Sequence, residues 1–369
     1  MKESDCTAPA ARDDLRPIVE PLLDWYEQHR RPLPWRTDPT PYHVWISEIM
    51  LQQTRIEAVL PYYARFLAAF PTPEALAEAE DDRLMKLWEG LGYYSRARNL
   101  KRAAQRVVEL GGIPSELSGL LSLPGVGAYT AGAIASIAFG LPEPAVDGNV
   151  LRVIARLRAD ERDVLAEATR RDVTERLRAV YPTTPAEASA MTQALMELGE
   201  VVCIPNGAPH CEDCPLGAFC LARLRGLTEK IPVRAPKKPR KVVCRTVLLL
   251  THGGKIAIRK RGERGLLAGL WEFPAMEESL DRDGCLNRLR AMGFAPLSVE
   301  PVGDAVHLFT HIEWRMGGFR VELPDEMLPV GAPDGLIFVT PKALHSDHAL
   351  PSAFRAFLPA LSSDESDAD

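Results

Sequence analysis

Four cysteines lie close together in the middle of the chain and could hold a metal centre. They are Cys203, Cys211, Cys214 and Cys220, in the pattern C-x7-C-x2-C-x5-C just after a helical pattern. Thiolates select soft metals, and four of them can hold one compact [4Fe–4S] cluster, whereas zinc ribbons usually pair two C-x-x-C knuckles across a longer stretch. The spacing favours an iron–sulfur cluster over zinc. Disulfides are a third interpretation, which the lack of a signal-peptide pattern disfavours.

A second candidate feature is the sequence LPGVGAYT, which begins at Leu123 and lies between two short helical patterns. Gly125 and Gly127 flank Val126 and allow a tight turn with close approach of another backbone. The N–H groups that open the second helix could then meet a DNA phosphate. An ordinary hairpin of two helices is the alternative. A phosphate contact would provide affinity without sequence specificity.

Two carboxylates are candidates for acid–base chemistry. Glu48 follows Val44 by four residues and precedes Leu51 by three, so a helix would turn its carboxyl towards apolar surroundings and raise its pKa. Asp147 lies in the sequence PAVDGNV, which leads into a helical pattern. Taken alone, the first pattern also suits an exposed glutamate, and the second suits a helix N-cap at Asp147 or Asn149.

The order of hairpin, aspartate and cysteine cluster resembles the helix–hairpin–helix DNA glycosylase superfamily of the endonuclease III type, over residues 15 to 225. The segments WISEIMLQQT, from Trp45, and WEGLGYYSR, from Trp88, are similar to those of the adenine DNA glycosylase (MutY) family. A β-rich C-terminal half adds to this second resemblance, which runs almost end to end.

The resemblance implies roles for the candidate residues. A protonated Glu48 would donate to a ring nitrogen of adenine, and Asp147 would stabilise the positive charge that develops on the sugar. Asn149 would orient neighbouring groups, and Tyr129 would contact the reacting centre. Glu197, in the sequence ALMELG, is a weaker candidate for the supporting network.

Further positions concern the reaction type and the DNA. Bifunctional relatives have a lysine where this chain has Tyr129, so the resemblance implies a monofunctional hydrolase that leaves an abasic site. Gln53, Leu91 and Tyr93 match positions that probe or wedge the base stack, although core packing is an alternative for the last two. Two other functions stay open: a bifunctional pyrimidine-damage glycosylase and lyase, and a non-catalytic iron–sulfur DNA-binding protein.

The C-terminal half resembles the Nudix-like domain of this family. It contains GLLAGLWEFP, from Gly265, but the following segment lacks the R-E-x-x-E-E acids of a working Nudix hydrolase. The resemblance implies that Phe309, Thr310 and His311 read 8-oxoguanine opposite the target adenine. Thr310 adds a methyl group where many relatives have serine, and packing in a β-hairpin is the alternative for Phe309.

The secondary structure that must position these residues is predicted to change from helices to strands along the chain. Apolar residues at three- and four-residue spacing predict helices from 15 to 227, whereas TVLLLTHGGKIAIRKR, from Thr246, predicts strand, turn and strand. The expected fold is multidomain, all-α followed by α+β. We predict a flexible N-terminus at 1–14, a helical glycosylase domain at 15–227 with the cluster segment at 203–220, a basic Pro-rich linker at 228–241, a Nudix-like domain at 242–360 and a disordered acidic tail at 361–369.

Charge distribution is more informative than the net charge of −6. Ten lysines or arginines and no acid occur between Ile231 and Arg261, and five occur between Arg96 and Arg106. Such blocks could bind along the phosphates of DNA, although the shorter block also suits a solvated helix face. No apolar run reaches the roughly 18 residues of a membrane helix. We expect a cytoplasmic or nucleoid-associated monomer that acts on double-stranded DNA with A:8-oxoguanine or A:G mispairs.

Overall fold

The computed structural model describes residues 14–236, 239–324 and 335–361. Apart from Asp14 and Leu361, the predicted flexible N-terminus and acidic tail lie outside these ranges. The chain divides into two compact units. The first takes Met1–Ala77 and Asn99–Pro236, and the second takes Glu78–Arg98 and Lys237–Asp369.

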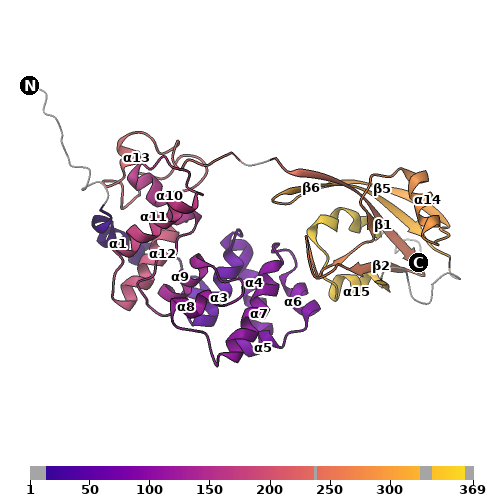
Figure 1. The fold of residues 1–369 in the computed structure, drawn as a ribbon, viewed down its shortest axis with the longest axis horizontal. Coiled ribbons are helices and arrows are strands. Elements are labelled where there is room, and N and C mark those ends of the chain that lie inside the picture. Colours follow the sequence, from indigo (N-terminus) through magenta and orange to yellow (C-terminus); the bar gives the residue numbers. More distant parts are fainter. Residues whose placement is uncertain (1–13, 237–238, 325–334, 362–369) are drawn as a thin grey trace, which may run out of the picture. The chain divides into compact units, whose positions relative to one another are not determined.

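The described part of the first unit is helical, as the apolar spacing predicts (Figure 1). Its elements are η2 (Arg16–Ile18), α1 (Val19–His29), α2 (Pro34–Thr37), α3 (Pro41–Leu51), α4 (Ile56–Ala69), α5 (Pro73–Ala77), α7 (Ser95–Glu109), which begins in the second unit, α8 (Leu117–Leu121), α9 (Ala128–Ile137), α10 (Gly148–Arg158), α11 (Glu167–Arg178), α12 (Pro185–Val201) and α13 (Leu221–Leu224).

Helix α10 shows how local sequence sets these elements. The Asp147 side chain caps its N-terminus by accepting a hydrogen bond from the N–H of Val150, at 2.7 Å. The helix ends where Ala159 adopts a left-handed conformation, with φ of 51°. Between these ends its apolar side chains are buried in a core that α1 and α12 also line. The cap therefore fixes the position of Asp147 relative to a buried helix.

The predicted hairpin lies between α8 and α9. Gly125 has φ of +77°, and a Cβ atom there would lie 2.5 Å from the Cβ of Asn99. Both the backbone conformation and the close approach require glycine. Gly127 is the N-cap of α9, and no side chain caps that helix. The first N–H groups of α9 are therefore available to an external acceptor.

The second unit contains a sheet with the strand order β3-β2-β1-β6-β5, to which β4 adds by pairing with β1 and β7 by pairing with β2. Its strands are β1 (Lys241–His252), β2 (Lys255–Lys260), β3 (Trp271–Glu272), β4 (Ala275–Met276), β5 (Ser298–Leu308), β6 (Ile312–Glu322) and β7 (Leu336–Val339). Strand β1 runs parallel to β6, and β6 runs antiparallel to β5. Residues 309–311 form the turn between β5 and β6.

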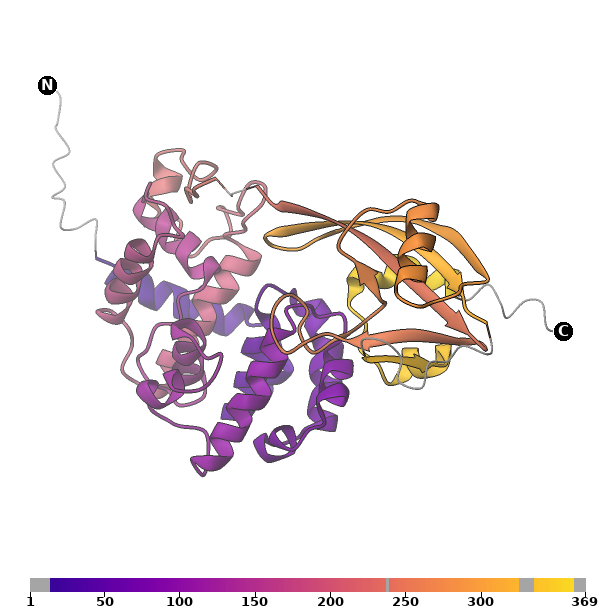
Figure 2. The ribbon, with the colours of Figure 1, turned by 45° about the vertical axis from the view of Figure 1, so that its right-hand side comes forward.

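Helices cover both faces of this sheet (Figure 2). Helix α14 (Arg282–Ala291) contributes Cys285 and Leu289 to one apolar core. Helices α15 (Pro341–Ser346) and η4 (Ser352–Leu361) contribute Leu344 and Phe354 to the other. Helix α6 (Asp81–Trp88) belongs to the same unit, although it precedes the sheet by more than 150 residues in the chain. The α+β prediction for the second half is confirmed.

None of the helices in the described ranges is long and apolar enough to cross a membrane.

Candidate active site and thiol cluster

A cavity of about 130 Å³ in the first unit brings together the four residues predicted to take part in catalysis. They come from three segments distant in the sequence: Glu48 from α3, Tyr129 from α9, and Asp147 and Asn149 from the start of α10. Each of these segments is a helix or a capped helix end, so the side chains are held on rigid elements. The cavity is the candidate active site.

Glu48 is buried, with 5% of its surface exposed, and its Oε2 atom accepts a hydrogen bond of 2.5 Å from the Tyr129 hydroxyl. Burial raises the pKa of Glu48 to about 7, and the nearby Asp147 adds to the increase, whereas the Tyr129 bond and Arg36 oppose it. Because this pKa is close to neutral pH, Glu48 can hold a proton and also release it.

Asp147 faces the same cavity while it caps α10. Burial raises the pKa of Asp147, and the backbone N–H groups of Val150 and Asn149 oppose that effect by hydrogen bonding to the carboxylate. The two buried carboxyl groups, Glu48 and Asp147, also disfavour each other's ionisation. Two carboxyl groups that share one cavity can divide the roles of an acid and a cation-stabilising group.

A third buried carboxylate, Glu197 on α12, lines the cavity but is paired. Arg31 donates two hydrogen bonds to it, one of them 3.0 Å long, and Arg36 donates another at 2.7 Å. Burial alone would raise the pKa of Glu197, but the bonds from the two arginines outweigh it and lower the pKa. Glu197 is therefore an ionised anchor for Arg31 and Arg36, both of which also line the cavity.

Sequence analysis did not single out Arg31, Arg36 or Glu200, which complete the charged lining. Arg31 lies in the connection between α1 and α2, and Arg36 lies in α2. Both belong to a basic, proline-containing stretch whose sequence looks like a surface turn. Only their pairing with Glu197, more than 160 residues later, reveals the role. No periodic pattern in the sequence could have indicated it.

The four cysteines line one small pocket together with Arg156. Burial raises the pKa of Cys214 to about 11, so this thiol would ionise only beside a strong cation. In the described ranges no group of three or more His, Cys, Asp or Glu residues has the arrangement of a metal-ion site. Four thiols around one pocket are the donor set that an iron–sulfur cluster takes.

Helix α10 connects this pocket to the candidate active site. The Nη1 atom of Arg156 donates to the Cys203 sulfur at 3.3 Å and to the Ile204 carbonyl at 3.0 Å. One turn earlier, Arg152 donates to the Cys203 carbonyl at 2.7 Å and to the Asn149 side chain at 2.8 Å. Both arginines are buried. They tie the first cysteine to the helix end that carries Asp147 and Asn149.

The residues predicted to contact DNA differ in exposure. In the hairpin Gly125 and Gly127 are exposed and Val126 is buried. Gln53 has the rare positive φ of 57°. In the second unit Leu91 is buried, whereas Tyr93 is 45% exposed.

The predicted reader residues lie at the turn between β5 and β6. The N–H of Phe309 donates to the Ile312 carbonyl at 2.8 Å, and its ring packs edge-on against Trp314. Thr310 and His311 are exposed at this turn. Two bonds from neighbouring residues hold the turn. Arg240, just before β1, donates through Nε to the Phe309 carbonyl at 2.8 Å, and the N–H of Lys241, the first residue of β1, donates to the His311 carbonyl at 3.0 Å.

Comparison with known proteins gives matches in both halves of the chain. Residues 46–179 match the HhH-GPD superfamily of base excision DNA repair proteins, and residues 245–360 match the NUDIX domain. The adenine DNA glycosylase of Homo sapiens is 34% identical over 91% of this chain and 73% of its own length. That of Buchnera aphidicola from Acyrthosiphon pisum is 30% identical over 82% of this chain and 86% of its own.

Among solved structures, a thermostable thymine-DNA glycosylase is 27% identical and superposes on 60% of this chain and all of its own, with a TM-score of 0.52. The resemblance predicted from the motifs is thereby confirmed over most of the sequence. The chain belongs to the adenine DNA glycosylase family.

Proposed function

We propose that this protein hydrolyses the N-glycosidic bond of adenine mispaired with 8-oxoguanine or guanine in double-stranded DNA and leaves an abasic site. The observation that carries the proposal is the convergence of Glu48, Tyr129 and Asp147 on one cavity. The family to which the chain belongs supports the choice of adenine as the base.

Glu48 supplies the proton. With a pKa of about 7, a substantial fraction of Glu48 is protonated at neutral pH, and the acid donates to a ring nitrogen of adenine. Protonation makes the base a better leaving group. The Tyr129 hydroxyl, which donates to Oε2, fixes the rotamer of the carboxyl.

Asp147 stabilises the sugar as the base departs. Positive charge develops on the deoxyribose, and an ionised carboxylate in a site that excludes water stabilises it strongly. The backbone bonds to Asp147 hold that carboxylate in place before the reaction. Asn149, which Arg152 holds, orients neighbouring groups. The Glu197 anchor keeps Arg31 and Arg36 on the cavity wall.

The reaction stops at the abasic site. A coupled strand cleavage requires an amine that attacks the sugar as a Schiff-base nucleophile. Tyr129 takes the position of that amine, and the described lining of the cavity includes no lysine. These residues therefore fit a monofunctional hydrolase.

The DNA contacts follow from the two units. In the first, the exposed glycines and uncapped N–H groups of α9 receive a phosphate. In the second, Phe309, Thr310 and His311 read the base opposite the target adenine. The predicted wedge residues Gln53, Leu91 and Tyr93 fill the gap that remains in the base stack when adenine leaves the duplex. Since Leu91 is buried, the exposed Tyr93 is the better candidate for direct contact with bases.

Cys203, Cys211, Cys214 and Cys220 would hold a [4Fe–4S] cluster, which would act as a structural centre beside α10. When bound, the cluster supplies a rigid link between distant segments, and the hydrolysis needs no electron transfer. Arg156, which contacts the Cys203 sulfur, provides positive charge beside the thiolates. A cluster held there would stabilise the helix that carries Asp147.

A single-turnover assay on matched duplexes tests the proposal. Duplexes with A:8-oxoguanine, A:G, A:T and thymine glycol are analysed with and without alkali. We expect strand breaks only after alkali, fastest for A:8-oxoguanine. Breaks without alkali, or a preference for thymine glycol, would indicate a bifunctional pyrimidine-damage enzyme. Binding without base release would indicate a non-catalytic DNA-binding protein.

A further inference from the structure

Helix α6 is attached to the sheet of the second unit at both of its ends. At its start the Asp82 carboxylate accepts hydrogen bonds from the Lys260 ammonium at 2.7 Å and from the Trp271 indole N–H at 3.3 Å. The Lys260 ammonium also lies 5.6 Å from the centre of the Trp271 ring. Lys260 ends β2 and Trp271 opens β3, so Asp82 joins α6 to two neighbouring strands.

The other end of α6 meets the segment that follows α15. The Lys86 ammonium donates to the His348 carbonyl at 3.1 Å and pairs with Glu89 at 2.7 Å. Glu89 in turn accepts a hydrogen bond of 2.9 Å from the backbone N–H of Leu350. The His348 ring packs edge-on against Trp271, which connects the contacts at the two ends of the helix.

The turn that follows α6 carries Tyr93. The indole N–H of Trp88 donates to the Gly92 carbonyl at 3.1 Å, and Arg96 donates to the carbonyls of Leu91 and Gly92. The Arg96 guanidinium lies near the rings of both Trp88 and Tyr93. These bonds fix the turn relative to α6. Tyr93 adopts the left-handed φ of 47°, a conformation that costs energy and persists only when its surroundings impose it.

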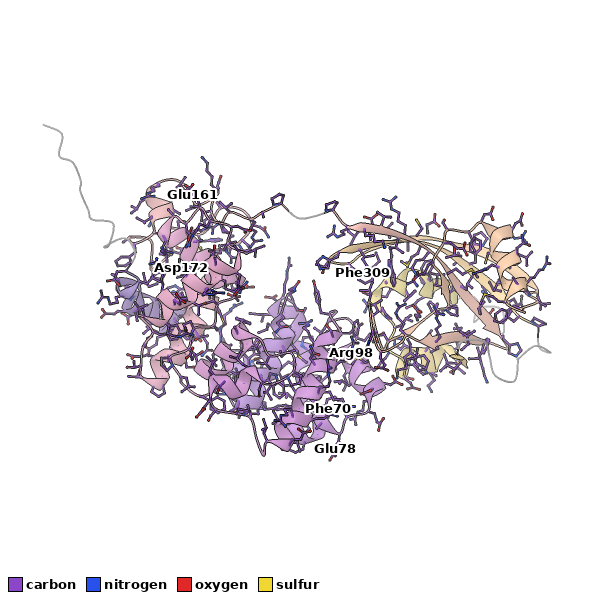
Figure 3. The ribbon with its side chains drawn as sticks, in the orientation of Figure 1. Phe70, Glu78, Arg98, Glu161, Asp172 and Phe309 are labelled. Carbon is purple, nitrogen blue, oxygen red and sulfur yellow. The ribbon has the colours of Figure 1, made fainter. Side chains whose placement is uncertain are left out.

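Tyr93 lies beside the predicted reader turn. Its hydroxyl is 3.5 Å from the Thr310 hydroxyl, and both residues are exposed. Beyond Tyr93 the Arg98 guanidinium, labelled with Phe309 in Figure 3, donates to the Ala268 carbonyl. The segment from Asp82 to Arg98 is thus bonded to the C-terminal half of the chain at several points along its length.

We propose that Asp82, Lys260 and Trp271 form a latch through which the C-terminal half of the chain positions Tyr93 next to Thr310. The residue that wedges the base stack, Tyr93, and the turn that reads the opposite base then form one surface before DNA binds. The proposal rests on the proposed function. Asp82, Lys260 and Trp271 touch neither substrate nor the reacting atoms, so they are positioning residues. Because the Asp82 and Lys260 side chains are each about 40% exposed, their ion pair contributes little to folding stability. Its contribution is geometric.

A charge-swap experiment in the full-length protein tests the latch. Asp82→Lys and Lys260→Asp are made singly and together, each in a background with Glu48→Gln so that chemistry does not proceed. The target adenine is replaced by 2-aminopurine opposite 8-oxoguanine, and the rise in fluorescence on binding reports extrusion of the base. Each single variant is expected to lower the extruded fraction about three- to tenfold, and the swap is expected to restore at least half of the loss.

The matched control is Glu80→Lys. Glu80 is the exposed N-cap residue of α6 and makes no capping bond, so this variant changes the charge at the same helix end without touching the latch. It is expected to behave as the parent protein, and thermal unfolding of every variant checks that the fold is intact. Single variants with unchanged extrusion, or a swap no better than either single variant, would overturn the latch. Failure of the parent protein, with Glu48 intact, to release adenine would instead overturn the proposed function.

Discussion

Arg152 and Cys203 are joined by a hydrogen bond of 2.7 Å from the Arg152 Nε atom to the Cys203 carbonyl oxygen. The same guanidinium donates to the Asn149 side chain and to the Gly199 carbonyl at 2.7 Å. One buried side chain therefore connects the backbone of the first cysteine with the helix end that carries the candidate catalytic residues. Any change at the thiol pocket that moves Cys203 is expected to move Asn149.

Arg152→Leu should weaken both the fold and the reaction. It removes the donor to the part-buried Cys203 carbonyl and to the buried Gly199 carbonyl, and a buried group left unsatisfied costs about 1–3 kcal/mol. We expect a lower free energy of unfolding in denaturant, slower adenine release and a lower iron content. Arg178→Leu, which removes an exposed ion pair with Glu143, is the control. Equal behaviour of the two variants would contradict the connecting role of Arg152.

Glu48→Gln should abolish base release and spare DNA binding. The substitution keeps the size of the side chain and removes the proton, and general acid catalysis typically contributes about 10²–10⁴-fold to a rate. Single-turnover cleavage after alkali and a binding titration on the same A:8-oxoguanine duplex measure the two effects. Glu20→Gln, at an exposed position of α1, should retain the parent rate. Substantial adenine release by Glu48→Gln would disprove the assignment.

The same substitution should stabilise the protein at alkaline pH. The folded-state pKa of Glu48 is raised from 4.5 to about 7, so the folded state holds a proton that the unfolded state releases between these values. Stability is therefore lost as the pH rises through that window. Each pKa unit corresponds to about 1.4 kcal/mol, so Glu48→Gln should gain up to about 3 kcal/mol relative to the parent at pH 8. At pH 4 the gain should vanish, and urea unfolding at both pH values provides the comparison.

The reaction rate should fall as the pH rises through about 7, because Glu48 must be protonated when it acts. A fall is also expected on the acidic side, where Asp147 becomes protonated at a pH above its usual range. Single-turnover rates should therefore fall on both the acidic and the alkaline side of an optimum. A rate that stays constant from pH 6 to pH 9 would argue against Glu48 as the acid.

Phe309→Ala should reduce discrimination between opposite bases. The Phe309 ring packs on Trp314 and supports the turn that presents Thr310 and His311. We expect the ratio of adenine release from A:8-oxoguanine to that from A:G to fall about tenfold, together with a lower thermal stability because the packing on Trp314 is lost. Val306→Ala, at a position that is 63% exposed in β5, is the control from the same strand. If the ratio of the two release rates stays unchanged, Phe309 has only a packing role.

Several features of this protein are readable from its sequence because they depend on residues close together in the chain. Helical periodicity and the change to strands after the Pro-rich stretch correctly predicted a helical half and an α+β half. Gly125 is readable because the tight turn requires a positive φ, here +77°, that favours glycine. The cap by Asp147 is equally local, since its partner Val150 is three residues away. Such features follow from backbone sterics and short-range hydrogen bonds.

Other features exist only in the tertiary structure. Arg31, Arg36 and Arg152 look like surface charges in the sequence, yet Arg152 is buried and the other two pair with the buried Glu197 across more than 160 residues. The pKa of Glu48 likewise depends on burial and on Asp147, 99 residues later in the chain. The attachment of α6 to the sheet also has no local signal. Long-range packing determines which polar side chains are buried. Burial in turn determines which ion pairs and hydrogen bonds these side chains make and how far their pKa values shift.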